Sequence, residues 1–256
     1  MTMEEMAKPS ASHTGHKKRT RYVEIDFFRG IALIMMLVSN FVTDLQYFAG
    51  YDQYQTFWRV FALLTASMFV FISGVSAWMS HFHASVSKFL KRFFRLFGLG
   101  LAITVFTKIF LEEGTIYFGV LHFLAVAGLL AIPFLKFGSY NLFLAIPFFA
   151  GKFLVEGLHS ENLLLLPLGI TPVPFFTFDY FPVFPWFGVF LLGVGTGAIF
   201  YPDGIRRFDF IFPENPVSGM VSALGRHTLK IYLVHQPVFA SLLLLYLGNL
   251  PGVKIL

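Results

Sequence analysis

Cysteine is absent from the 256 residues of the chain. The chain therefore has no thiol nucleophile, carries no acyl group as a cysteine thioester, and contains neither disulfides nor cysteine-ligated metals. Charge is also scarce, because Asp, Glu, Lys and Arg make up 13% of the residues, about half of the roughly 25% that is usual in soluble domains. So little charge leaves too few polar groups to cover a surface that faces water on all sides.

The motifs that identify many soluble enzymes are missing as well. The sequence contains no Walker loop, no GxGxxG loop before a helix, no HExxH zinc motif and no GxSxG nucleophile elbow. Its net charge of +5 is concentrated in a few short segments, which in a membrane protein set topology and contact anionic lipids. We therefore expect membrane lipids as partners, and not nucleic acid.

Hydrophobic residues make up 56% of the chain, with 35 phenylalanines. About 20 apolar residues in a helix span the roughly 30 Å hydrocarbon core of a bilayer. We predict an all-α integral membrane protein, a bundle of about seven transmembrane helices. The predicted spans are Phe27–Phe48, Phe57–Met79, Phe97–Leu111, Ile116–Phe137, Tyr140–Val155, Pro185–Tyr201 and a seventh within Gly219–Gly248.

Residues outside the spans indicate the orientation. Residues 1–20 are polar and lack the short apolar core of a signal peptide, so they are predicted to be a disordered cytoplasmic tail; residues 21–250 form one transmembrane domain. Basic residues gather in the segments that alternate along an up-down path, which predicts a multi-pass protein of the cell membrane with its N-terminus in the cytoplasm. These residues are Lys17, Lys18, Arg19, Arg21, Lys88, Lys91, Arg92, Arg95, Lys136, Arg206 and Arg207.

The first span carries polar residues along one side. At 100° per residue, Asp26, Arg29, Asn40 and Asp44 fall within an arc of roughly 60°. Ionisable groups inside a membrane usually face a bundle interior or a watered cavity, so this stripe marks a candidate site. The structural alternative is an ion pair between Asp26 and Arg29 at the headgroup level, with Asp44 in the far interface. That alternative explains Asn40 less well.

Two histidines lie inside apolar runs. A neutral imidazole can act as a general base near pH 7, which makes His122 and His235 catalytic candidates. Packed histidines that bond a neighbouring helix are equally consistent with the sequence. Tyr232 and His235 are three residues apart and are predicted to share a helix face, next to Gln236.

The segment Glu156–Phe184 is rich in proline and phenylalanine and has no helical period. It ends near Asp179 and Trp186, at the mouth of the sixth predicted span. The segment is interpreted either as a re-entrant lid over a pocket or as an interfacial aromatic belt.

The basic segment His81–Leu96 is predicted to be an amphipathic link between the second and third spans. The segment has two interpretations: it is a topology determinant in contact with lipid, or it is a site for the phosphates of a nucleotide-like donor. In the second interpretation, Arg92 and Arg95 would bind these phosphates together with Arg226 and His227.

Five segments in order resemble the catalytic-domain family of the heparan-alpha-glucosaminide N-acetyltransferases. They are RYVEIDFFRGIALIMMLVSN, MFVFISGVSAW, IYFGVLHFLAVAGLLAIPFL, FDYFPVFPWFGVFLLGVGTG and LGRHTLKIYLVHQPV, and they cover about Arg21 to Phe239. The resemblance implies an acyltransferase-like domain that moves an acetyl group from cytoplasmic acetyl-CoA to a sugar or glycolipid amine or hydroxyl. It departs from the family at Leu45–Thr56, a loop that contains no histidine where the lysosomal enzyme has its active one.

The hypothesis of acyl transfer assigns roles to individual residues. His122 is predicted as the base, oriented by Asp179 or Asp44, with no metal. The predicted acyl-CoA-binding residues are Arg29, Asn40, Arg92, Arg95, Arg226 and His227, and the predicted acceptor-binding residues are Asp26, Trp186 and His235. A transporter or flippase of a lipid-linked or polar solute, an inactive family member and a homodimer all remain open.

Overall fold

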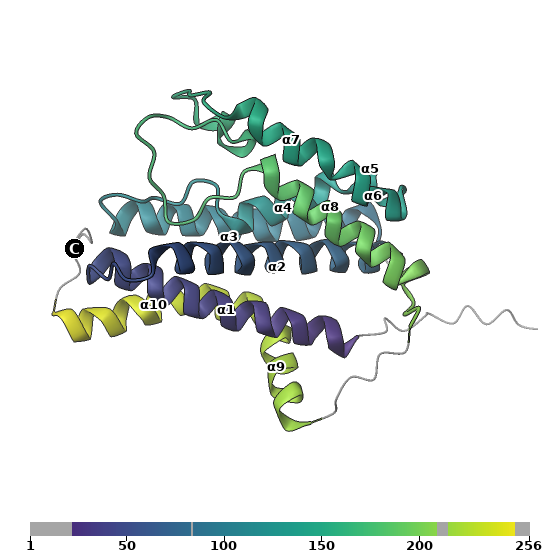
Figure 1. Cartoon of the computed structure of the whole chain (residues 1–256), viewed down its shortest axis with the longest axis horizontal. Coiled ribbons are helices and arrows are strands. Elements are labelled where there is room, and N and C mark those ends of the chain that lie inside the picture. The colour runs from purple at the N-terminus through teal and green to yellow at the C-terminus, as the bar shows by residue number, and fades with distance from the viewer. Residues whose placement is uncertain (1–21, 83, 209–214, 249–256) are drawn as a thin grey trace, which may run out of the picture.

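The structure is a computed structural model that describes residues 22–82, 84–208 and 215–248. These residues form a bundle of helices and contain no β-strand beyond one isolated bridge between His159 and Thr171, which confirms the predicted all-α class. The predicted tail at residues 1–20 lies outside the described residues. In order, the helices are α1 (Val23–Phe48), α2 (Gln55–His81), α3 (Val86–Phe110), α4 (Val120–Leu130), α5 (Ile132–Leu135), η1 (Gly138–Tyr140), α6 (Asn141–Leu144), α7 (Ile146–Val155), η2 (Leu163–Leu168), α8 (Val183–Phe200), η3 (Pro202–Gly204), α9 (Pro216–Arg226) and α10 (Thr228–Leu247), as Figure 1 shows.

Six helical stretches of the described chain are long and apolar enough to cross a membrane. They are α1, α2, α3, the run from Gly138 to Val155, α8 and α10. The predicted fourth span corresponds to α4, whose 11 residues are apolar but shorter than a span, followed directly by α5. The chain is thus a multi-pass membrane protein with six candidate spans among the described residues, and the count of about seven stays a prediction.

One predicted boundary is wrong. Helix α3 begins at Val86, so most of the basic segment predicted as a separate link is the first half of a 25-residue helix. No proline interrupts Val86–Phe97, and lysine, arginine and leucine all favour helix, so the helix continues through its charged turns. The last predicted span, placed within Gly219–Gly248, contains α10, and the chain turns at His227 to separate α10 from the preceding helix α9.

The connections with clustered positive charge meet at one end of the bundle. The Tyr22 hydroxyl, beside the start of α1, donates a hydrogen bond of 3.2 Å to the Gly204 carbonyl after α8. The Trp78 indole, near the end of α2, donates one of 2.9 Å to the Tyr201 carbonyl. The opposite end brings the Tyr47 ring of α1 to 4.8 Å from the Phe178 ring. This arrangement fits the up-down path from which the cytoplasmic N-terminus is predicted.

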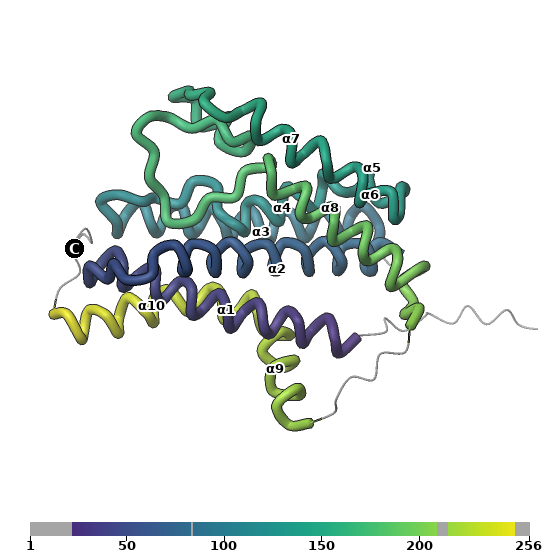
Figure 2. The backbone as a smooth tube through the Cα atoms, in the orientation of Figure 1, coloured from purple at the N-terminus to yellow at the C-terminus, as the bar shows by residue number. Residues whose placement is uncertain are grey.

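The segment between α7 and α8 folds back onto the bundle. Figure 2 shows it leaving the end of α7, turning, and returning beside the loop that precedes α4. Two backbone hydrogen bonds fix this return, from the Phe178 amide to the Gly114 carbonyl at 3.3 Å and from the Phe181 amide to the Phe118 carbonyl at 3.0 Å. Asp179, between these bonds, is therefore held against the start of α4.

Candidate functional site

The second half of α1 meets α10 through an amide–imidazole pair that is partly buried. Asn40 Nδ2 lies 2.9 Å from His235 Nε2, and His235 Nδ1 lies 2.6 Å from the Tyr232 carbonyl oxygen. A carbonyl only accepts, so Nδ1 carries the proton of the neutral ring and Nε2 accepts from Asn40. The ring is 7% exposed, and its centroid lies 5.5 Å from that of Tyr232, so the predicted shared face of Tyr232 and His235 is confirmed.

One turn further along α1, Asp44 has a similar partner on α10. Gln236 Nε2 lies 2.8 Å and 3.0 Å from the two carboxylate oxygens of Asp44, which is 3% exposed. Two consecutive residues of α10 thus meet two residues of the α1 stripe. Polar pairs of this kind fix the rotation of one membrane helix against another.

The first half of the stripe faces α2 instead. Arg29 Nη1 is 2.9 Å from Asp26 Oδ1, and Arg29 Nη2 donates a 2.8 Å hydrogen bond to the Ser76 hydroxyl. The ion pair that the structural alternative required is therefore present. The stripe is divided between two partner helices and does not form one continuous polar path.

Asp179 caps the N-terminus of α4. Its Oδ2 accepts a 2.9 Å hydrogen bond from the Val120 amide and a longer one, 3.4 Å, from the Tyr232 hydroxyl. A carboxylate here interacts favourably with the helix dipole. A Cβ on Gly119 would lie 2.3 Å from Oδ2, so the close approach depends on a glycine. Asp179 thereby connects α4 to the turn of α10 that carries His235.

The charge of Asp179 is predicted to lower the stability of the protein at neutral pH. Burial raises the pKa of this carboxyl from 3.8 to about 6, against the opposing effect of the hydrogen bonds from Val120 and Tyr232. Between pH 3.8 and about pH 6, the Asp179 carboxyl is ionised in the unfolded chain and protonated in the folded chain. The free energy of unfolding therefore falls as pH rises through this range, and it stays lower above pH 6. The penalty at pH 7.5 is at most about 3 kcal/mol.

Asp179→Asn should therefore raise the thermal midpoint in detergent at pH 7.5 and change it little at pH 4, because asparagine keeps an oxygen for the Val120 amide and stays neutral. The matched control is Asp203→Asn, at an exposed position with positive φ that asparagine also tolerates. A lower midpoint for Asp179→Asn than for this control at pH 7.5 would contradict the prediction.

His122, in the first turn of α4, is enclosed by aromatic rings. Its ring is 2% exposed, packs at 5.2 Å from the Phe97 ring and 5.8 Å from the Phe118 ring, and covers Gly100, where a Cβ would lie 2.8 Å away. Within the described chain, His122 Nε2 has no hydrogen-bond partner. The hydrogen bonds of Asp179 and Asp44 go to other residues, so the predicted orientation of His122 by either carboxylate is not formed in this structure.

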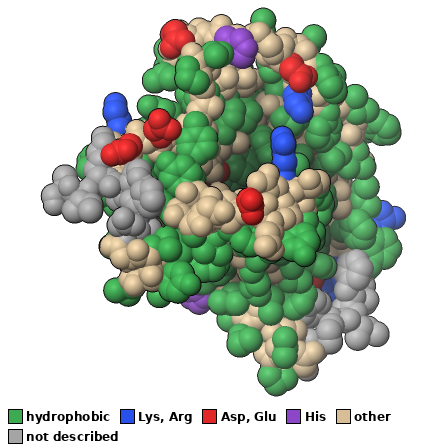
Figure 3. All heavy atoms as spheres, turned by 60° about the vertical axis from the view of Figure 1, so that its left-hand side comes forward, with side chains coloured by type: hydrophobic (Ala, Val, Ile, Leu, Met, Phe, Trp, Pro, Cys, Tyr) green, Lys and Arg blue, Asp and Glu red, His purple; other side chains and the backbone are tan. Residues whose placement is uncertain are grey.

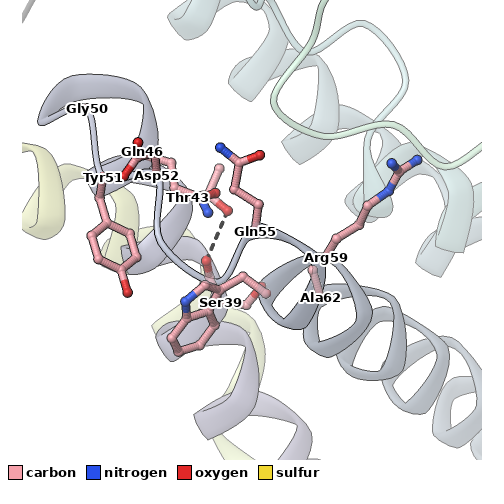
Figure 4. Close-up of a pocket in the computed structure, with 10 residues that line it drawn as sticks. Ser39, Thr43, Gln46, Gly50, Tyr51, Asp52, Gln55, Arg59 and Ala62 are labelled. Carbon is pink, nitrogen blue, oxygen red and sulfur yellow. Dashed lines mark hydrogen bonds between the residues drawn. The ribbon is translucent and has the colours of Figure 1, made fainter.

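A polar pocket of about 540 Å³ opens where α1 ends and α2 begins. In Figure 4, Gln55 and Arg59 extend from the first turns of α2, across from Thr43 and Gln46 of α1. Figure 3 looks towards this end of the molecule and shows a hollow with acidic and basic side chains at its rim. The lining residues are Ser39, Thr43, Gln46, Gly50, Tyr51, Asp52, Gln55, Trp58, Arg59 and Ala62.

Sequence reasoning did not find this pocket. Ser39, Thr43 and Gln46 are spaced by four and three residues, which places them on one face of α1. That spacing was the available signal, but uncharged polar residues near a helix end are common and point to no site by themselves. Trp58, which also lines the pocket, has an indole nitrogen that is buried without a hydrogen-bond partner in the described part of the chain.

The predicted donor-binding residues do not form one cluster. Arg92 and Arg95 lie in the first half of α3, whereas Arg226 and His227 lie where α9 turns into α10. Figure 1 shows α3 and α9 on opposite sides of the α1–α2 pair. Trp186, predicted to bind the acceptor, packs its ring 4.6 Å from that of Phe181. Among the described residues, no three His, Asp or Glu side chains come together as metal ligands.

A model of one protein family matches residues 21–237, most of the chain, and describes the catalytic region of heparan-alpha-glucosaminide N-acetyltransferase. The chain therefore belongs to this family of membrane acetyltransferase-like proteins, and the predicted resemblance is confirmed. Neither the curated proteins nor the solved structures contain a significant match to the chain.

Proposed function

We propose that the protein is a membrane-bound acyltransferase that moves an acetyl group from acetyl-CoA to an amine or hydroxyl of a sugar. The observation that carries the proposal is the family match over residues 21–237, which includes the polar half of α1 and its partners on α10. The polar pocket beside that half of α1 gives a sugar many hydrogen-bonding groups, from Gln46, Asp52, Gln55 and Arg59. Amides and ions of this kind fix the orientation of a polar ligand.

The reaction is direct transfer without an acyl-enzyme, in keeping with the absence of cysteine. A base removes a proton from the acceptor amine or hydroxyl while its nitrogen or oxygen attacks the thioester carbonyl. The carbon–sulfur bond breaks, and the CoA thiolate leaves and takes up the proton. His122 is the proposed base, because its Nε2 has no competing partner in the described chain. Because the Phe97 and Phe118 rings pack against it and it is 2% exposed, His122 would have to become accessible for a substrate to reach it.

The donor and the acceptor are proposed to come from opposite sides of the cell membrane. With the N-terminus in the cytoplasm, α1 starts on the cytoplasmic side and its pocket-lining end faces outward. Arg92, Arg95, Arg226 and His227 then lie toward the cytoplasm, where each is able to contact CoA phosphates. They would contact the donor from two sides of the bundle, since α3 and α9 lie apart.

The assay is acetyl transfer from radiolabelled acetyl-CoA by purified protein, with glucosamine and glucose as the amine and hydroxyl probes. Replacing a general base typically lowers the rate about 10²–10⁴-fold, so His122→Ala should lower transfer by about 100-fold or more. The control is His159→Ala, an exposed histidine of the segment after α7.

Equal transfer by His122→Ala and His159→Ala would exclude His122 as the base while leaving an active enzyme. No transfer to either probe, together with no binding of acetyl-CoA by calorimetry, would contradict the proposed function. Uptake of a labelled sugar into vesicles that contain the protein, without acetylation, would instead favour the alternative that the protein is a transporter.

A further inference from the structure

Arg59 is a charged residue of a membrane-spanning helix that has no counter-ion in the described part of the chain. It lies in the second turn of α2, lines the polar pocket, and forms no ion pair or hydrogen bond with other described residues. Two other arginines of the bundle are paired, Arg29 with Asp26 at 2.9 Å and Arg206 with Glu24 at 2.6 Å. An arginine that stays charged in a spanning helix without a partner indicates a functional site.

The Arg59 side chain belongs to the pocket face of α2 and not to its lipid face. At 100° per residue, the pocket-lining residues of α2 fall within an arc of roughly 100°; they are Gln55, Trp58, Arg59 and Ala62. Exposed apolar residues lie on the opposite side of the helix, among them Phe57, Val60 and Leu64. The charge of Arg59 is therefore available to a ligand in the pocket.

The other polar side chains around Arg59 are uncommitted as well. Gln46, Tyr51 and Gln55 line the pocket and make no side-chain hydrogen bond to any residue that the structure describes. Asp52 also lines it, without an ion pair to Arg59, and Figure 4 shows Gln55 between these two charged side chains. The guanidinium suits an anion, whereas the carboxylate suits the amine or hydroxyl donors of a sugar. A ligand that carries both kinds of group complements the pocket.

The chemistry of these groups favours a phosphate as the anion. A planar guanidinium binds phosphate or carboxylate oxygens through two parallel N–H groups. A phosphate has three acceptor oxygens, more than a carboxylate, and is able to accept from Gln55 or Tyr51 as well as from Arg59. The volume of about 540 Å³ is within the roughly 300–1,000 Å³ of small-molecule sites, so a sugar phosphate has room.

We infer that the acceptor is a phosphorylated sugar, and that Arg59 determines this specificity by binding the phosphate in the pocket. The inference rests on the proposed function and names the substrate class within it. The phosphate belongs either to a soluble sugar phosphate or to a lipid-linked glycosyl phosphate, because both present the same group to the guanidinium. Arg59 binds the acceptor and takes no part in the proton transfer.

The first test is calorimetry on the full-length protein in detergent, with glucosamine and glucosamine 6-phosphate as ligands. The phosphate should lower Kd about 10–100-fold, the usual effect of a hydrogen bond to a charged group. Arg59→Leu should abolish this difference, and Arg59→Lys should keep part of it, since lysine retains the charge without the planar fork. The matched control is Lys108→Leu, which removes a positive charge from the last turn of α3 and should keep the wild-type Kd.

The second test is acetyl transfer, which also separates the two sources of phosphate. Arg59→Leu should raise KM for glucosamine 6-phosphate about 10-fold or more and leave kcat and KM for acetyl-CoA unchanged. Farnesyl-phosphoryl-glucosamine in phosphatidylcholine vesicles is the lipid-linked probe. A lower KM for this probe than for glucosamine 6-phosphate identifies a lipid-linked acceptor, and the reverse identifies a soluble one; Arg59→Leu should raise whichever KM is lower.

Two results would overturn the inference and leave the acyltransferase proposal standing. One is an equal Kd for glucosamine and glucosamine 6-phosphate, or a difference that persists in Arg59→Leu, in a protein that acetylates glucosamine. The other is a thermal midpoint that rises with phosphatidylglycerol, but not with phosphatidylcholine or glucosamine 6-phosphate, only when Arg59 is present, which would assign the guanidinium to a lipid headgroup. Arg59-dependent binding of glucosamine 6-phosphate without acetyl transfer or acetyl-CoA binding would instead overturn the proposed function and leave the phosphate site in place.

Discussion

Replacing Gly193 with leucine is expected to prevent α2 and α8 from packing, so that the protein is recovered mainly as aggregate. The two helices cross where each presents a glycine to the other. A Cβ on Gly193 would lie 2.1 Å from the Phe71 carbonyl oxygen, and a Cβ on Gly74 would lie 2.1 Å from the Phe190 carbonyl oxygen. Both obstacles are backbone atoms, which cannot rotate aside as a side chain does.

The expected cost follows from what must move. Overpacking a core usually costs about 1–3 kcal/mol, and a leucine against backbone at the centre of the most extensive helix pair should exceed that range. Small residues at such crossings are what allow membrane helices to approach closely. Since folded proteins are stable by only about 5–15 kcal/mol, a loss of this size populates unfolded and aggregated chains.

The matched control for this prediction is Gly98→Leu on α3, where a Cβ meets no atom within 4 Å. This variant adds a leucine to an exposed helical position and should elute with the wild-type protein on size-exclusion chromatography, with a thermal midpoint no lower. Gly193→Leu should elute in the void volume or unfold at a much lower temperature than the wild-type protein. Indistinguishable profiles for the two variants would show that the crossing tolerates a side chain.

The spans were predictable because they depend on local composition. Apolar runs bounded by turns give the positions of α1, α2, α8 and α10 to within a few residues. Helix α3 was predicted to start about ten residues late, because hydropathy falls over Lys88 to Arg95 although those residues favour helix. Hydropathy reports contact with lipid, whereas helix formation depends on backbone geometry, and the two differ at a charged helix end.

The site was predictable only one helix at a time. The polar arc of α1 follows from helical spacing, and so does the shared face of Tyr232 and His235. That Asn40 meets His235 depends on how α10 rotates against α1, which no pattern within either segment specifies. The capping of α4 by Asp179 joins residues 59 positions apart and was invisible for the same reason.

The least expected feature is an ion pair at the start of α1, in which the carboxylate is buried and the arginine partly exposed. Sequence reasoning treated Arg206 as a topology determinant and gave Glu24 no role. In the structure Arg206 Nη2 lies 2.6 Å from Glu24 Oε2, and the Tyr201 hydroxyl donates to Glu24 Oε1 at 3.0 Å. Glu24 is 5% exposed, although it lies next to the predicted headgroup region. The pair ties the end of α8 to the start of α1.

Glu24→Ala is therefore expected to destabilise the protein by about 3 kcal/mol, the low end of the about 3–5 kcal/mol that follows loss of one partner from a buried pair. The low end applies because the Arg206 side chain is 27% exposed and keeps some contact with water. Arg206 would be left with its guanidinium 5.2 Å over the Tyr22 ring, which offsets little of the loss. The Tyr201 hydroxyl, in a buried hydrogen bond with Glu24, would lose its acceptor.

A double-mutant cycle with Glu24→Ala, Arg206→Ala and the double variant measures this directly, by thermal and denaturant unfolding in detergent. Once one partner is gone, removing the other should cost little, so the coupling energy should exceed about 1 kcal/mol in magnitude. Arg207→Ala is the matched control, since the neighbouring arginine is exposed and should change stability by no more than about 0.5 kcal/mol. Additive effects of Glu24→Ala and Arg206→Ala would mean that the two side chains are neighbours that do not stabilise each other. The Tyr22 hydroxyl, which contacts the Gly204 carbonyl and the Arg206 amide, would then be among the contacts that hold the end of α8 to α1.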